Sequence, residues 1–227
     1  MNELHSRLTR LDSCVVSDAL DKLGLAGVAA GLGRLSTEKK LAGPVLTVKL
    51  ESAQGRLANR HLCTAAIEAA ASGDIIVVEH HSRADCAGWG GLLSKAASVK
   101  GIPGVIVDGL CRDIDESREL GFTVFARGVV PTTARGRIIE TGFNCPITVG
   151  AVTVRPGDWV IADGSGVVFL RPEHAEAIVG TAEQLVAREA ALVKEIEAGA
   201  PVSKVMSRTY EHMTQKEIGD GGKLQGR

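Results

Sequence analysis

The sequence predicts an α/β fold in which βαβ units are joined to a β-rich half. Two apolar, β-branched runs at residues 75–79 and 104–109 flank a helical segment, which is typical of buried parallel strands. After Pro131, short apolar runs alternate with turn residues, which indicates antiparallel strands. The length of 227 residues, with 44% hydrophobic and 23% charged residues, fits a globular chain.

The first part of the chain alternates helix and strand. Apolar side chains at helical spacing, Ala-rich stretches and glycine stops separate helices from β-branched runs. The expected elements are a helix at residues 7–25 with its stop at Gly24, a strand at 43–50, a helix at 59–71, a strand at 75–79 and a helix at 92–100. A second unit then repeats the order, with a strand at 104–109, a short charged helix at 113–120 and a strand at 122–126. This order implies a sheet that is parallel in part.

The last third of the chain reads as a β layer followed by one long helix. The apolar runs RIIE, PITV, VTV, DWVIA and GVVFL are short, and the tract DGSG at residues 163–166 predicts a hairpin turn. Residues 172–197 repeat apolar side chains every three or four positions, so we expect a helix whose apolar stripe faces the body. We expect one domain over residues 1–200, and a polar tail or intersubunit arm over residues 201–227.

Composition disfavours two classes of partner. The net charge is −1 and aromatic residues make up 3%, so we expect no nucleic-acid partner, because phosphate binding needs a basic surface. No apolar run approaches 18 residues, so we expect no membrane span, and the opening MNELHSRLTRLD is too polar for a signal peptide. Five scattered cysteines without a CxxC pair indicate reduced thiols and a cytoplasmic location.

The densest polar cluster, CRDIDESRE, follows the strand predicted at residues 104–109. Ligands of open α/β sheets gather at such carboxyl ends. Arg112 offers a planar fork for a carboxylate, and Asp113 offers an oxygen ligand for a hard cation such as Mg²⁺ or Mn²⁺. On a helix Asp113 and Glu116 share one face, and Arg112 can pair with Glu116. The alternative is a solvated helix whose acidic side chains complement the helix dipole. Cys111, beside Arg112, is either a thiol of lowered pKa or a small buried side chain.

A glycine-rich cluster, HHSRADCAGWGGLLSK, follows the strand predicted at residues 75–79. Gly90 and Gly91 allow a ligand to approach the backbone, and a helix starting near Leu92 would point its free N–H groups at an anion. The alternative is a turn that only connects two elements. The tract is neither a Walker loop nor GxGxxG, so it indicates no nucleotide. His80 and His81 would point to opposite faces of a strand and rarely share one ion.

These clusters together resemble a known family. Gly91, twenty further residues, Arg112-Asp113, two more residues and Glu116 form G-x20-R-D-x2-E, a pattern that marks the RraA-like proteins. The blocks GIPGVIVDGLCRDIDE, ELGFTVFARG and VTVRPGDWVIADGSGVV resemble the family in the same order, over roughly residues 10–195. The family includes class II pyruvate aldolases that act on 4-hydroxy-4-methyl-2-oxoglutarate and 4-carboxy-4-hydroxy-2-oxoadipate. It also includes proteins that bind and inhibit ribonuclease E.

The resemblance implies a swivelling β/β/α fold, assembled as a homotrimer or as a homohexamer of two trimers. It implies a lyase that cleaves a 4-hydroxy-2-oxo acid to pyruvate and decarboxylates oxaloacetate, with a non-catalytic regulator as the alternative. It implies a divalent metal, Mg²⁺ or Mn²⁺, held at Asp113 largely through waters. The groups that the resemblance implies for the pyruvate moiety are the backbone of Gly90, Gly91, Leu92 and Leu93 and the guanidinium of Arg112.

Three positions complete the comparison with the family. Established aldolases carry an acidic residue where this chain has Gly91, and some members have an acid where this chain has Ser117. Glu189 lies in REAAL, which resembles a helical segment whose Glu reaches the neighbouring subunit's site in the aldolases. A solvated helix face is the alternative for Glu189.

Overall fold

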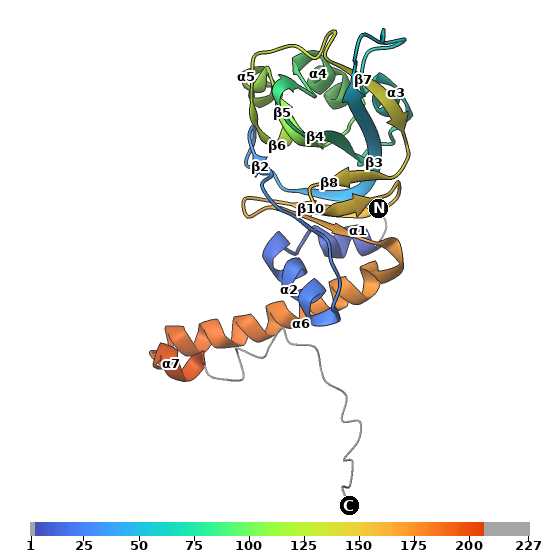
Figure 1. The fold of residues 1–227 in the computed structure, drawn as a ribbon. Helices are drawn as coiled ribbons and strands as arrows, with labels where there is room; N and C mark the ends of the chain where they lie inside the picture. The colour runs from blue at the N-terminus through green and yellow to red at the C-terminus, as the bar shows by residue number, and fades with distance from the viewer. Residues whose placement is uncertain (1–2, 207–227) are drawn as a thin grey trace, which may run out of the picture.

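The computed structural model describes residues 3–206, and a nine-stranded mixed sheet forms its centre (Figure 1). The order along the sheet is β1-β11-β10-β3-β4-β5-β6-β2, with β7 also paired to β3, and β8 and β9 form a separate hairpin. The strands are β1 Val28–Ala29, β2 Gly33–Arg34, β3 Leu41–Ser52, β4 Ile75–Ala87, β5 Gly104–Cys111, β6 Thr123–Val129, β7 Ile138–Phe143, β8 Ile147–Val149, β9 Val152–Val154, β10 Trp159–Ala162 and β11 Val167–Leu170. The predicted α/β class, with a β-rich second half, is confirmed.

The centre of the sheet is parallel, as the βαβ pattern predicts. β3, β4, β5 and β6 pair in parallel, and helices α3 (Thr64–Ala69), α4 (Gly91–Val99) and α5 (Ile114–Glu119) cover one face at the top of Figure 1. Val105 and Val107 pack under these helices, whereas Ile106 packs into a second core on the other face. Because both faces are covered, the strands read as continuous apolar runs.

The β-rich half closes onto the beginning of the sheet. β10 pairs antiparallel with the first residues of β3, and β11 pairs with β10 and β1. The tract DGSG is the turn between β10 and β11, where the Asp163 N–H donates to the Gly166 carbonyl at 3.0 Å. The predicted hairpin turn is therefore confirmed.

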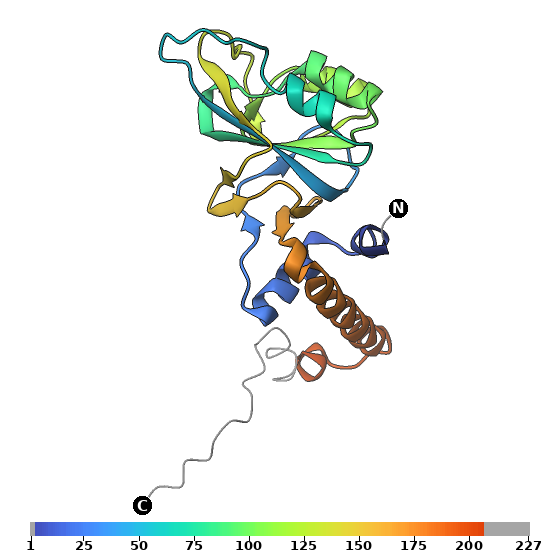
Figure 2. The same cartoon turned by 90° about the vertical axis from the view of Figure 1, so that its right-hand side faces the viewer.

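Four further helices form the end of the molecule opposite to α3, α4 and α5 (Figures 1 and 2). They are α1 Glu3–Leu8, α2 Ser13–Leu23, α6 Pro172–Glu197 and α7 Val202–Val205. The bounds predicted for α6 are confirmed, and its first half packs with α1, α2 and β11 through side chains such as Ile178 and Leu185. Beyond Leu185 the stripe is exposed at Val186, Val193 and Ile196, so only the first half of α6 faces the body as predicted.

Some predicted boundaries are wrong. The helix expected over residues 7–25 is two helices, because the Asp12 side chain caps the start of α2 by accepting the Val15 N–H at 2.8 Å; Gly24 ends α2 as predicted, with φ 67°. The helix expected over residues 59–71 shrinks to α3, because the Glu140 carboxylate accepts the Cys63 N–H at 2.7 Å and fixes a non-helical segment before it.

The strand predicted at residues 75–79 continues to Ala87 as a bulged extension of β4, with shifts of register against β5. The glycine-rich cluster therefore starts inside a strand and not in a loop. At the other end of the chain, α7 occupies the beginning of the predicted tail, and the rest of that tail, residues 207–227, lies outside the described residues. Among residues 3–206, no helix is long and apolar enough to cross a membrane.

Candidate active site

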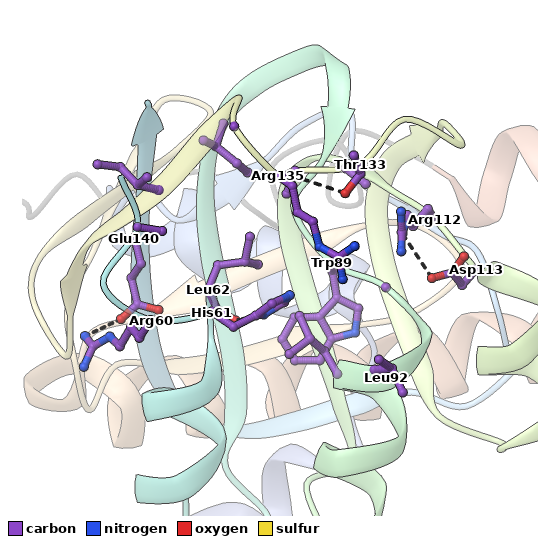
Figure 3. Close-up of a pocket in the computed structure, with 18 of the residues that line it drawn as sticks. Arg60, His61, Leu62, Trp89, Leu92, Arg112, Asp113, Thr133, Arg135 and Glu140 are labelled. Carbon is purple, nitrogen blue, oxygen red and sulfur yellow. Dashed lines mark hydrogen bonds and ion pairs between the residues drawn. The ribbon is translucent and has the colours of Figure 1, made fainter. Parts of the chain in front are cut away.

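A cavity of about 260 Å³ opens at the carboxyl ends of β4 and β5 (Figure 3). Four segments line it: the loop before α3, the junction of β4 with α4, the end of β5, and the loop that leads into β7. The cavity contains every residue that the sequence predicts for the pyruvate and metal sites, namely Gly90, Gly91, Leu92, Leu93, Arg112 and Asp113. The two clusters that follow separate strands in the sequence are thus brought to one place.

Backbone hydrogen bonds hold these two clusters together. The Arg112 N–H donates to the Trp89 carbonyl at 3.0 Å, and the Gly88 N–H donates to the Leu110 carbonyl at 2.8 Å. Asp113 then turns the chain into α5 with φ 56° and ψ 40°, a left-handed conformation that is uncommon for residues other than glycine. Such conformations cost free energy and gather at functional sites. Here the turn directs the Asp113 side chain back toward Gly91.

The Asp113 carboxylate uses one oxygen within the protein and leaves the other without a partner within residues 3–206. Its Oδ2 accepts the Gly91 N–H at 3.0 Å and the Arg112 Nε–H at 3.2 Å. Its Oδ1 has no hydrogen-bond partner among the described residues, and a third of the side chain is exposed. The Gly91 N–H, which we expected to bind the pyruvate moiety, donates instead to Asp113. Arg112, which we expected could pair with Glu116, pairs with Asp113.

The start of α4 supplies the remaining backbone donors. Gly90 caps the helix in an extended conformation, and Leu92 and Leu93 belong to the first turn, where a helix has no acceptor for its own N–H groups. Leu93 is buried, whereas Leu92 is 85% exposed at the rim of the cavity. These two amides are therefore available to an anion, as the sequence predicts for this helix start.

The Glu116 side chain occupies the space beside Gly91. A Cβ atom placed on Gly91 would lie 1.8 Å from the Glu116 Oε2 and 3.1 Å from the Asp113 Cβ. Glu116 and Asp113 thus face the same side of α5, as predicted, and both face Gly91. The Glu116 carboxylate fills the space that a side chain at position 91 would need.

A series of buried side-chain hydrogen bonds, which the sequence did not predict, links Trp89 in the cavity wall to helices α4 and α5. The Trp89 Nε1–H donates to the Ser94 Oγ at 2.9 Å, and the Ser94 Oγ lies 2.9 Å from the Ser117 Oγ. The Trp89 ring also stacks on Phe122, with ring centroids 6.1 Å apart. All these side chains are buried, so Ser117 has no room for the acid that some family members carry there. The only sequence signal was the rarity of tryptophan, of which the chain has two.

The far wall of the cavity also went unpredicted. Glu140 on β7 has a side chain only 1% exposed and binds Arg60 as well as the Cys63 N–H. Figure 3 shows Arg135 and His61 reaching from opposite walls toward Trp89. The only sequence pattern that pointed to this wall is the pairs of arginines that precede α3 (Arg56 and Arg60) and β7 (Arg135 and Arg137).

The remaining candidate residues lie elsewhere. His80 is buried and burial lowers its pKa, whereas His81 is exposed, so the two do point to opposite faces. Burial raises the pKa of the Cys111 thiol, so the idea of a lowered pKa is wrong and Cys111 is a small buried side chain. Glu189 lies on α6, at the end of the molecule opposite to the cavity (Figure 1), where burial and the nearby Asp18 charge raise its pKa.

The donor chemistry of the cavity fits a hard divalent cation held largely by water. Within residues 3–206 there is no group of three or more His, Cys, Asp or Glu side chains that could hold a metal ion. Mg²⁺, however, usually takes one or two protein carboxylates and keeps several waters. The free Oδ1 of Asp113, with the Glu116 carboxylate beside it across Gly91, meets that requirement.

Comparisons with known proteins concern the family and the fold of the chain. A family model for RraA-like proteins, described as Aldolase/RraA, matches residues 13–169. "Putative 4-hydroxy-4-methyl-2-oxoglutarate aldolase" of Halalkalibacterium halodurans is 33% identical over 174 residues, covering 74% of this chain and 77% of that protein. "Protein DlpA" of Legionella pneumophila is 28% identical over 179 residues, 79% of this chain, and the chain spans 29% of its length.

A solved structure adds support from the fold. Streptomyces coelicolor RraAS2, described as an unusual member of the RNase ES inhibitor RraA protein family, superposes with a TM-score of 0.77 at 28% identity, over 84% of this chain and 95% of that one. The family model covers well over half of the chain, and the residues it matches include the whole Gly91–Glu116 motif. The chain belongs to the RraA-like family.

Proposed function

We propose that the chain is a divalent-metal-dependent carbon–carbon lyase that cleaves a 4-hydroxy-2-oxo acid to pyruvate by a retro-aldol reaction and also decarboxylates oxaloacetate. The observation that carries the proposal is the junction of Arg112, Asp113 and the first turn of α4 in one cavity. The name of the Halalkalibacterium halodurans relative supports the same activity.

The cavity can hold the carboxylate end of a 2-oxo acid. The Arg112 Nε is engaged by Asp113, but its two terminal nitrogens have no partner within residues 3–206. This end of the guanidinium forms a planar pair of donors that matches a carboxylate. The Leu92 and Leu93 N–H groups belong to the first turn of α4, at its positive end, and can donate to an oxygen of the same carboxylate.

Both reactions pass through a pyruvate enolate. A divalent cation bound at Asp113 would supply Lewis-acid stabilisation of that enolate. Arg112 would hold the carboxylate and orient the bond that breaks. The described residues that line the cavity include no lysine, so a Schiff-base route has no nucleophile in this part of the chain.

The test is a substrate screen with a coupled assay. The protein would be incubated with oxaloacetate and with a set of 4-hydroxy-2-oxo acids in Mg²⁺ or Mn²⁺, and pyruvate would be coupled to lactate dehydrogenase. We expect turnover that EDTA abolishes and that added metal restores. Absence of metal-dependent turnover on all of these acids would refute the lyase.

A regulator that binds a ribonuclease is the second candidate, favoured by the likeness to Streptomyces coelicolor RraAS2. A pull-down against ribonuclease E without added metal separates the two. Tight binding without any catalysis supports the regulator, and no binding rejects it.

We also expect a homotrimer or homohexamer in the cytoplasm. The exposed apolar side chains Val186, Val193 and Ile196 on the outer half of α6 support assembly. Glu189 lies on α6, far from the cavity of its own chain. If it contributes to a site, that site belongs to a neighbouring copy. Light scattering that shows a monomer at every concentration would contradict the assembly.

A further inference from the structure

Arg135 differs from the other arginines that line the cavity. Its guanidinium has no hydrogen-bond or ion-pair partner among the described residues, although its backbone N–H donates to the Thr133 Oγ1 at 3.3 Å. Each of the other three has a carboxylate partner: Arg56 has Glu51, Arg60 has Glu140, and Arg112 has Asp113. Arg135 therefore brings an uncompensated positive charge to the cavity.

The loop that carries Arg135 is held in place. The Ala87 N–H donates to the Thr132 carbonyl at 3.0 Å, which ties the loop to the end of β4. The Arg137 Nη1–H donates to the Thr133 carbonyl at 3.2 Å, and the Arg137 N–H donates to the Ala134 carbonyl at 2.9 Å. In Figure 3 the Arg135 side chain extends from this loop toward Trp89, so it lines the cavity while it stays exposed to solvent. A free cation that the backbone aims at a cavity is a ready contact for an anion.

We propose that Arg135 determines specificity by binding a second anionic group of the substrate, at the end away from the keto-acid carboxylate. The identity of the first group, held by Arg112, rests on the proposed function. Arg112 and Arg135 approach the space above Trp89 from different segments, so a ligand that spans them carries negative charge at both ends (Figure 3). The buried Trp89 ring between them is an apolar floor for the intervening carbons. The chemistry that fits is a 2-oxo acid with a second carboxylate.

The test compares two ligands that differ only in the distal group. 2-Oxoglutarate and 2-oxopentanoate have the same five-carbon chain, one ending in a carboxylate and the other in a methyl group, and neither has the 4-hydroxyl that a retro-aldol needs. Binding would be measured by titration calorimetry in Mg²⁺ for the wild type, for Arg135→Gln and for the matched control Arg10→Gln. Arg10 is an exposed arginine just after α1, outside the cavity lining, and its Nη2–H donates to the Ser6 Oγ at 3.4 Å.

We expect the wild type and Arg10→Gln to prefer the dianion by about ten- to a hundredfold, as for one charge-assisted contact, and Arg135→Gln to lose the preference. Equal binding of both ligands by the wild type, a preference that survives in Arg135→Gln, or one lost equally in Arg10→Gln would overturn the proposal. So would failure of both ligands to bind. Exchange of the pyruvate methyl protons in D₂O, followed by NMR on the wild type, tests the lyase separately. No exchange with a retained dianion preference refutes the lyase and leaves the role of Arg135 standing.

Discussion

Replacing Asp113 by asparagine tests the metal-holding role of this carboxylate with little disturbance of the backbone. Asp113 has φ 56° and ψ 40°, and asparagine is among the few non-glycine residues that adopt this region readily. The amide oxygen of asparagine can still accept the Gly91 N–H, which Oδ2 now accepts at 3.0 Å. The substitution therefore removes the charge and one oxygen ligand while the turn into α5 remains.

The structure sets the size of the effect. The hydrogen bond from Gly91 at 3.0 Å becomes a neutral one, whereas the bond from Arg112 at 3.2 Å keeps its charged donor and loses only the charge of its acceptor. Because solvent screens the partly exposed side chain, we expect the free energy of unfolding to fall by about 1 kcal/mol. Metal affinity should fall more, by at least about tenfold, because an amide is a poorer ligand for a hard cation.

Arg112→Lys is the companion variant. Lysine keeps the charge but loses the planar fork, so kcat/KM should fall by about 30- to 1,000-fold, equivalent to about 2–4 kcal/mol. Pyruvate production would be followed against Mg²⁺ and Mn²⁺ concentration. Excess metal should partly restore Asp113→Asn and leave Arg112→Lys unchanged. An identical response of the two variants to metal, or full activity in either, would refute the division of roles.

Three further changes test the surroundings of the site and the fold. Gly91→Ala should change stability by no more than about 1 kcal/mol, because its Cβ meets the flexible end of the Glu116 side chain, which can move away; a larger loss of melting temperature would show that the Glu116 carboxylate is fixed. Trp89→Phe should lower the free energy of unfolding measured in urea by about 1–2 kcal/mol, since it removes a buried hydrogen bond, and an unchanged value would show the bond to be dispensable. Burial alone would raise the pKa of Asp163, but hydrogen bonds from Ser13 hold it below its usual value. Its stabilising effect is therefore present above about pH 4 and lost as pH falls through the lower folded pKa, so the urea midpoints of wild type and Asp163→Asn should converge in acid and not stay parallel.

The sequence predicted those parts of the fold in which local pattern and tertiary packing agree. The apolar runs at β4 and β5 are buried on both faces, and the bounds of α6 follow from Pro172 at its start and its three-to-four spacing. The same reasoning located the core of the site, because Arg112 and Gly91 each follow a parallel strand and neighbouring strands end at one edge. The glycine-rich and charged clusters thus indicate the position of the site from short stretches of sequence.

The rest depends on partners distant in the chain. β1 and β2 are two residues long and exist because β11 and β6 pair with them. The helix expected over residues 59–71 loses its first turn to Glu140, about eighty residues later. Arg135 enters the cavity because a loop is tied to the end of β4, and its own neighbours in sequence do not indicate this. A local pattern cannot report such contacts.

The position of β3 also governs when the molecule can fold. This strand pairs through Gly43 with Val160 of β10, and through Val45 with Ile75 of β4, so the sheet joins segments from opposite ends of the described chain. Closing so long a loop loses chain entropy before any contact compensates for it, which slows folding. During synthesis, the first residues of β3, Leu41 to Pro44, therefore stay unpaired on one edge until β10 has left the ribosome. Until then the edge exposes backbone N–H and C=O groups that can pair with other chains.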